Sequence, residues 1–65
     1  MATIKVKEAI RRVEEAGWRL VATRGSHRHF KHPTIPGRVT IPGKLSDNLT
    51  PGTWNNIQRQ AGWRR

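Results

Sequence analysis

Three histidines, His27, His29 and His32, lie within six positions of one another, and they are the only histidines of the chain. Arg28 and Lys31 stand between them, and the segment holds no carboxylate and no cysteine. Histidine trades protons near neutral pH because its unperturbed pKa is about 6.5. The cationic neighbours indicate an anionic substrate. The segment therefore predicts acid–base chemistry on a phosphate-bearing ligand, without a metal.

Cleavage of RNA by internal transfer suits these residue types. A neutral imidazole can take the proton of a 2′-hydroxyl, which then attacks the adjacent phosphate. Cationic groups stabilise the charge that develops on the phosphate oxygens. The products are a 2′,3′-cyclic phosphate and a 5′-hydroxyl end, and DNA, which has no 2′-hydroxyl, does not react by this route. One histidine does not show whether it acts as the base or as the acid.

Other chemistries fit the sequence less well. Three imidazoles can hold a catalytic zinc ion, but alternation along a strand turns His32 away from His27 and His29. Divalent-metal nucleases need carboxylates, and outside the first predicted helix the chain has only Asp47. A serine hydrolase that uses Ser26 and His27 is disfavoured, because adjacent residues of a strand point to opposite faces. A non-catalytic RNA-binding module and a small basic scaffold protein stay open as rivals.

The charge of the chain is strongly positive: 13 Lys and Arg oppose 4 Asp and Glu, for a net charge of +9. From Gly17 onward, Asp47 is the only acid. This asymmetry favours a polyanionic partner, either nucleic acid or an acidic protein. The apolar runs are too short to span a membrane, and the amino terminus lacks the apolar core of a signal peptide. We therefore expect a cytoplasmic protein that does not associate with a membrane.

The first half of the chain predicts a helix followed by strands. Apolar residues recur at helical spacing over 4–16, and Gly17 is a natural end for that helix. Strands are predicted over 18–23 and 27–31, joined by a turn at Gly25-Ser26, and a third short strand over 38–41. A chain of 65 residues is expected to form one domain.

The second half predicts a loop and then a helix. Residues 43–49 are expected to be loop. Thr50 is a predicted N-cap, Pro51 is suited to the first helical position, and Gly62 ends the helix. Each helix has one apolar stripe, so both should pack on the same face of the sheet and leave the other face open. The predicted fold class is α+β.

Strand alternation predicts which side chains reach the open face. Phe30 is the best core candidate of its strand. Side chains of the opposite parity, joined by those of the third strand, should form a basic floor for an RNA backbone: His27, His29, Lys31, Arg38 and Thr40.

Several short motifs carry a family resemblance. They are Ala16-Gly17-Trp18, Gly25-Ser26-His27 followed by Phe30 and His32-Pro33, Val39-Thr40-Ile41-Pro42, and Pro51-Gly52-Thr53 before Gln60-Ala61-Gly62. In this order and spacing the chain resembles the HicA toxins, the mRNA interferases of HicA–HicB toxin–antitoxin systems, over nearly its whole length.

The resemblance implies one HicA-like domain over residues 1–65, with the α-β-β-β-α fold of double-stranded-RNA-binding domains. It also implies cleavage of mRNA independently of the ribosome, one catalytic histidine, His27, in the Gly-Ser-His motif, and a HicB-like antitoxin that covers the active face. Neither a metal nor another cofactor is expected. Gly25 and Ser26 form the turn that presents His27.

Candidate RNA-binding residues surround that histidine. Arg28, Lys31 and Arg38 are the candidates for binding phosphate. Many HicA toxins carry a further histidine shortly after the Val-Thr-Ile-Pro strand, where this chain has Gly43-Lys44. His29 and Lys44 are the candidates to replace it. The oligomeric state, with a monomer as one possibility, stays open.

Overall fold

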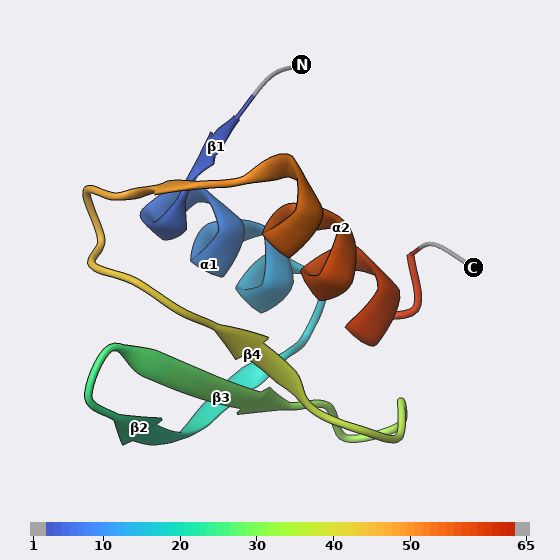
Figure 1. The fold of residues 1–65 in the computed structure, drawn as a ribbon. Coiled ribbons are helices and arrows are strands. Elements are labelled where there is room, and N and C mark those ends of the chain that lie inside the picture. Colours follow the sequence, from blue (N-terminus) through green and yellow to red (C-terminus); the bar gives the residue numbers. More distant parts are fainter. Residues whose placement is uncertain (1–2, 64–65) are drawn as a thin grey trace.

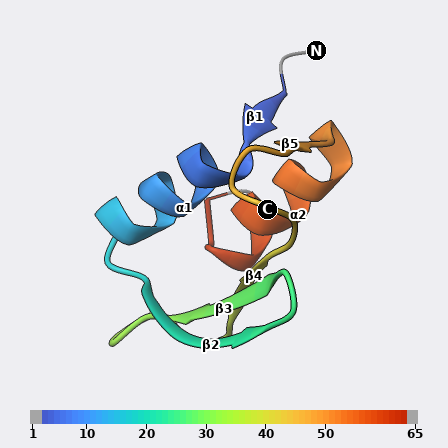
Figure 2. The ribbon, with the colours of Figure 1, turned by 90° about the vertical axis from the view of Figure 1, so that its left-hand side faces the viewer.

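Two helices cover one face of a three-stranded antiparallel sheet in the computed structural model, which describes residues 3–63 (Figure 1). The helices are α1 (Val6–Glu15) and α2 (Pro51–Gln60). The sheet has the order β2 (Arg19–Arg24), β3 (His27–Lys31), β4 (Val39–Ile41). Figure 2 shows the helices as one layer and the sheet as the other. The predicted α+β class and the order of its main elements are confirmed.

The two helices begin and end for local reasons that the sequence contains. Gly17, which follows the end of α1, has a φ of +99°, a value that favours glycine. At the start of α2 the Thr50 hydroxyl accepts a hydrogen bond from the Thr53 N–H at 3.2 Å, and Pro51 is the first helical residue. No helix within residues 3–63 is long and apolar enough to cross a membrane.

The hydrophobic core lies between the two layers. Trp18 is fully buried, and Phe30 is 1% exposed, which agrees with its predicted place. The core draws on both helices, on β3 and β4, and on the segments that join them: Val6, Ala9, Val13, Trp18, Phe30, Val39, Ile41, Leu49, Ile57 and Ala61. This packing fixes which face of β3 turns inward and therefore which face stays open.

A second, two-stranded sheet was not predicted. β1 (Ile4–Lys5) pairs with β5 (Asn48–Leu49), so the first helix starts at Val6 rather than at residue 4, and residues 43–49 are not all loop. The same loop caps α1, because the Val6 N–H donates to the Asp47 carbonyl at 2.9 Å and the Lys7 N–H to the Leu45 carbonyl at 3.2 Å. The start of the helix is therefore fixed by residues about forty positions away.

Strand β2 contains a bulge that reverses its alternation. Leu20 pairs with Phe30, whereas Ala22 pairs with His29, so Val21 is an extra residue between the two pairs. Leu20 and Ala22, which would share one face of a regular strand, therefore lie on opposite faces here. The bulge places Ala22 on the open face of the sheet, opposite His29.

The two outer strands of the three-stranded sheet differ in their cover. Both helices contact β4, and the Gln60 side chain of α2 accepts a hydrogen bond from the Thr40 N–H at 2.9 Å. Every residue of β2, in contrast, is exposed, including Leu20 at 50% and Val21 at 57%. The edge of β4 is therefore covered and that of β2 is open.

Candidate functional site

His27 lies at the start of β3, directly after the Gly25-Ser26 turn, and is exposed. Gly25 has a φ of +58°, and a Cβ atom there would meet no atom within 4 Å. The turn pairs His27 with Arg24 across the hairpin. Among residues 3–63, no side chain or backbone group forms a hydrogen bond with the His27 imidazole. Both of its ring nitrogens are therefore available to a ligand.

His29 lies two positions further on, in the middle of the sheet, and is half-buried. Its Nδ1 lies 3.0 Å from the Thr40 hydroxyl on β4. A groove of about 540 Å³ opens on this face, which we call the sheet groove; it is lined by Val21, Ala22, Arg24, His29, Lys31 and Arg38. The volume falls in the usual range of small-molecule sites, about 300–1,000 Å³. The structure thus brings together His29, Lys31 and Arg38, as strand alternation predicts, whereas His27 and Thr40, which were expected on the same floor, do not line this groove.

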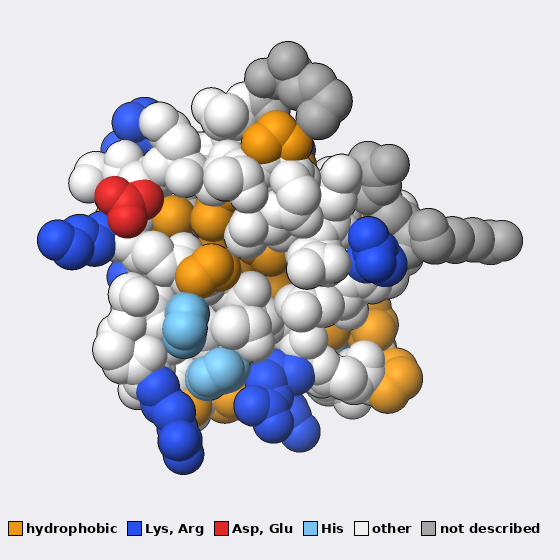
Figure 3. Space-filling model, viewed as in Figure 1, with side chains coloured by type: hydrophobic (Ala, Val, Ile, Leu, Met, Phe, Trp, Pro, Cys, Tyr) orange, Lys and Arg blue, Asp and Glu red, His pale blue; other side chains and the backbone are white. Residues whose placement is uncertain are grey.

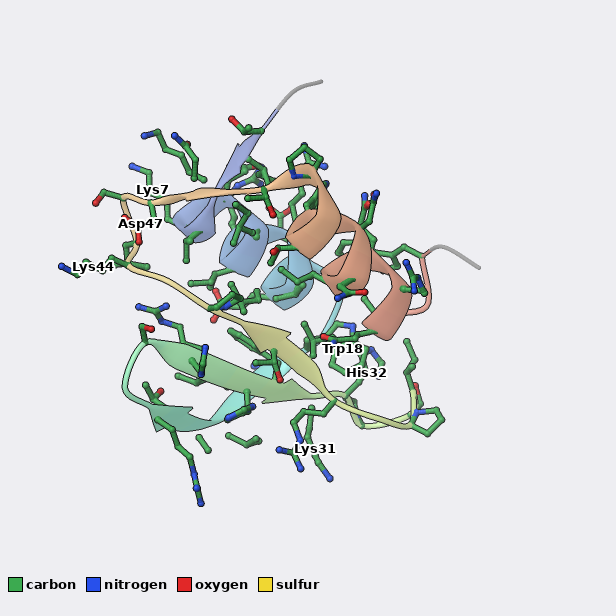
Figure 4. The ribbon with its side chains drawn as sticks, viewed as in Figure 1. Lys7, Trp18, Lys31, His32, Lys44 and Asp47 are labelled. Carbon is green, nitrogen blue, oxygen red and sulfur yellow. The ribbon has the colours of Figure 1, made fainter. Side chains whose placement is uncertain are left out.

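His32, just past the end of β3, is part of the protein framework. Its Nδ1 accepts hydrogen bonds from the N–H groups of Thr34 and Ile35, both at 3.1 Å, so the proton of the ring is on Nε2. That Nε2–H donates to the Ala16 carbonyl at 3.1 Å. The ring also packs edge-on against Trp18, with 5.3 Å between centroids (Figure 4). Both nitrogens are occupied, so His32 does not form a site with the other two histidines.

This arrangement explains one of the motifs. A Cβ atom on Gly17 would lie 2.8 Å from the His32 Nε2, closer than real Cβ contacts allow. The glycine therefore lets the imidazole reach the end of α1. The residues 16–18 and His32 form one packing unit, and the spacing of the two motifs reflects structure rather than chemistry. Within residues 3–63, no three His, Cys, Asp or Glu side chains gather as metal ligands would.

Arg28 does not face the sheet groove. Its guanidinium donates to the Gly43 carbonyl at 2.7 Å and lies 3.5 Å from the Ser26 carbonyl. Arg28 thus ties the β2–β3 turn to the loop that follows β4. Lys44, in that loop, is exposed, and its backbone N–H donates to the Asp47 carboxylate at 3.1 Å. Of the five predicted RNA-binding residues, His29, Lys31 and Arg38 line the sheet groove, and Arg28 and Lys44 do not.

The ion pairs within residues 3–63 all lie on α1. The Glu8 carboxylate pairs with Arg11 and Arg12 on the exposed side of α1. The hydrogen bond from Arg11, helped by Arg12, lowers the pKa of Glu8. At the sheet end of the molecule, Figure 3 shows Lys and Arg side chains beside the histidines. The histidines on this side of the molecule therefore have cationic neighbours (Figure 3).

A second groove was missed by the sequence prediction. We call it the helix groove; it has a volume of about 440 Å³ and is lined by Thr3, Ile4, Lys5, Lys7, Glu8, Arg12 and Trp54. Trp54 is half-buried and packs against the hydrophobic core. The signal that could have found it is the pair Lys5 and Lys7, which flanks the first residue of α1.

Fold and site together define a small basic α+β protein with an open sheet face and, at a Gly-Ser-His turn, a histidine that makes no hydrogen bond with any of residues 3–63. Residues 6–63 match the family described as the HicA toxin of bacterial toxin–antitoxin systems, and the chain belongs to this family. The resemblance seen in the sequence is confirmed. Membership gives the chain the role of a toxin and implies a cognate antitoxin. No curated protein matches the chain.

Proposed function

We propose that this toxin is an mRNA endoribonuclease that needs no metal and uses His27 to move the proton. The observation that carries this assignment is the contrast among the three histidines. His32 uses both ring nitrogens for the protein itself, and His29 uses one on Thr40. Only His27, within the described residues, keeps both nitrogens for a substrate.

The reaction draws on the position of His27 on the same strand as His29 and Lys31, which line the sheet groove, although His27 itself does not line it. The ribose 2′-oxygen attacks the neighbouring phosphorus, the bond from phosphorus to the 5′-oxygen breaks, and that oxygen leaves with a proton. His27 acts either as the base that takes the 2′-proton or as the acid that protonates the 5′-oxygen. One RNA fragment then ends in a 2′,3′-cyclic phosphate and the other begins with a 5′-hydroxyl.

The sheet groove supplies the charge that this reaction requires. Lys31, Arg38 and Arg24 line it, and cations placed around a phosphate stabilise the extra negative charge of the transition state. One ring nitrogen of His29 lies against the Thr40 hydroxyl. The other nitrogen can bind a phosphate oxygen or carry out the second proton transfer. Lys44 stands at the neighbouring loop, where many HicA toxins carry a histidine.

A HicB-like antitoxin with an acidic surface is the proposed partner. The basic side chains of the sheet face and the open edge of β2 form the surface that such a protein would cover. Covering that surface would also remove His27 from RNA. We place the activity in the cytoplasm, where its substrate mRNA is found.

The test is incubation of the purified chain with RNA, with and without a chelator, followed by analysis of the product ends. We expect cutting that is insensitive to chelator and products with 2′,3′-cyclic phosphate and 5′-hydroxyl ends. His27→Ala should abolish the cutting while circular dichroism stays unchanged. Chelator-sensitive cutting, 3′-hydroxyl products or full activity of His27→Ala would contradict the mechanism. If the unaltered chain binds RNA and never cuts it, the chain is an RNA-binding module instead.

A further inference from the structure

The helix groove combines free cations with an aromatic wall. Lys5 and Lys7 line it, and neither forms an ion pair within residues 3–63. Its single acid, Glu8, is already bound by Arg11 and Arg12. The groove therefore presents unneutralised positive charge to solvent.

Trp54 forms the aromatic side of the helix groove. The Arg12 guanidinium carbon lies 5.9 Å from the centroid of the Trp54 ring. Trp63, which is 39% exposed, meets the same ring edge-on with 6.2 Å between centroids. Aromatic rings and guanidinium planes are the surfaces on which unpaired bases stack, and lysines track the phosphates. This combination is typical of a site for single-stranded nucleic acid.

The helix groove and the His27 turn are joined by one continuous edge of the molecule. Arg28, next to His27, bonds the Gly43 carbonyl. The loop then passes through Lys44 and reaches α1, where the Lys7 N–H bonds the Leu45 carbonyl. Figure 4 shows Lys44 and Lys7 along this edge, between the β2–β3 turn and the start of α1. Asp47 also lies on this edge, between Lys44 and Lys7 (Figure 4), and its carboxylate accepts a hydrogen bond from the Lys44 N–H. Arg28, Lys44 and Lys7 thus mark a path from His27 to the helix groove that passes one acid (Figure 4).

We propose that the helix groove is a second binding site for the RNA strand, on which an unpaired base stacks at Trp54 while Lys5 and Lys7 hold its phosphates. The strand runs from there along Lys44 to His27. This inference rests on the proposed function in taking RNA as the ligand. The inference adds a contact site for RNA on the helix layer of the fold, whereas the sheet groove lies on the sheet layer.

The test uses binding rather than cutting. A fluorescent single-stranded oligonucleotide of 2′-O-methyl RNA, which cannot be cleaved by internal transfer, is titrated over a range of KCl concentrations. Each phosphate contact on single strands contributes about 0.7 to the slope of log affinity against log salt, so Lys5→Gln with Lys7→Gln should reduce the slope by about 1.4. Arg19→Gln with Arg59→Gln is the matched control, since it removes the same charge and neither residue lines either groove. The control should leave the slope nearly unchanged.

A second variant tests the aromatic wall. Trp54→Leu should weaken binding roughly tenfold at constant salt slope, because stacking and not charge is lost. In cleavage of ordinary RNA, the lysine pair should raise KM and leave kcat unchanged, because the groove holds a part of the strand that does not react. If Trp54→Leu does not fold, the lysine pair still decides.

Two results would overturn the site. One is an equal loss of slope in the lysine pair and in the arginine control, which would mean that only net charge matters. The other is unchanged affinity and slope in the lysine pair, as expected if the groove instead contacts an acidic protein or no ligand. Because the oligonucleotide cannot be cut, these readings hold even if the chain cleaves no RNA. Failure of the proposed function is therefore seen separately.

Discussion

The two ends of β3 carry the same residue type in opposite circumstances. His27, at the start, makes no hydrogen bond with any of residues 3–63, whereas His32, just past the end, is bound through both ring nitrogens and packs on Trp18. The difference comes from what surrounds each ring. His27 follows a turn with open space around it, and His32 lies beneath the end of α1. A histidine with its nitrogens filled stabilises a fold, and one with its nitrogens empty can transfer protons.

The sharpest test of this contrast replaces each histidine with alanine. His27→Ala should lower the rate of RNA cleavage by about 10²–10⁴-fold, the usual share of an acid or base, and change the free energy of unfolding by less than about 0.5 kcal/mol. His32→Ala should do the reverse, lowering stability by about 1–3 kcal/mol because it leaves backbone groups of Ala16, Thr34 and Ile35 without their partner. Urea denaturation and cleavage rates measure the two effects. Similar profiles for both variants would refute the division of roles.

Alanine substitutions at three glycines separate the cost of a steric contact from the cost of backbone strain. Gly17→Ala should destabilise most, because the new Cβ meets His32 at 2.8 Å and the residue has a φ of +99°; we expect a loss of about 1–3 kcal/mol. Gly25→Ala adds only strain, since nothing lies within 4 Å, and should lose about 1 kcal/mol. Gly52→Ala, inside α2 with open space around it, should gain about 0.5–1 kcal/mol. Thermal unfolding of the three variants checks this order, and equal losses at 17 and 25 would disprove the contact with His32.

Arg28→Gln tests the link between the His27 turn and the loop after β4. The variant loses a charge-assisted hydrogen bond to the Gly43 carbonyl, and we expect a loss of about 1–2 kcal/mol in stability. Hydrogen exchange should become faster around the β2–β3 turn and in residues 43–47, while the packing around His32 stays protected. Uniform protection loss over the whole chain would mean that Arg28 acts on global stability alone.

The smallest effect is expected at Glu8, whose carboxylate pairs with arginines on α1. Because Arg11 and Arg12 lower its pKa in the folded chain, the charged form favours folding. That contribution is complete above the ordinary glutamate pKa of about 4.3 and is lost as the pH falls through the lowered pKa of the folded chain. The difference in melting temperature between the unaltered chain and Glu8→Gln should therefore shrink in acid. A difference that grows in acid would contradict the direction of the shift.

Much of the fold follows from local sequence patterns. The stripe of Val6, Ala9 and Val13, the Thr50 cap with Pro51, and the turn at Gly25-Ser26 are properties of neighbouring residues, and each was predicted. Phe30 then fixed the parity of β3, which was enough to place His29 and Lys31 on the open face.

The features that were missed all depend on residues far apart in the chain. The β1–β5 pair joins Ile4 to Leu49, and each strand has only two residues, too few for a pattern. The bonds of Arg28 to Gly43 and of His32 to Ala16 span 15 and 16 positions. The bulge at Val21 has no marker such as glycine. The alternation along a strand can assign a side chain to a face of the sheet, but it cannot show which residue that side chain contacts.

The Gln60 side chain accepts a hydrogen bond from the outward N–H of Thr40. This hydrogen bond has a consequence for assembly. Growth of a fibril through this sheet requires two open edges on every molecule, one to receive a neighbour and one to offer. Among residues 3–63, the three-stranded sheet offers only β2. Two molecules joined at that strand would leave no edge for a third, so any association of this kind stops at a pair.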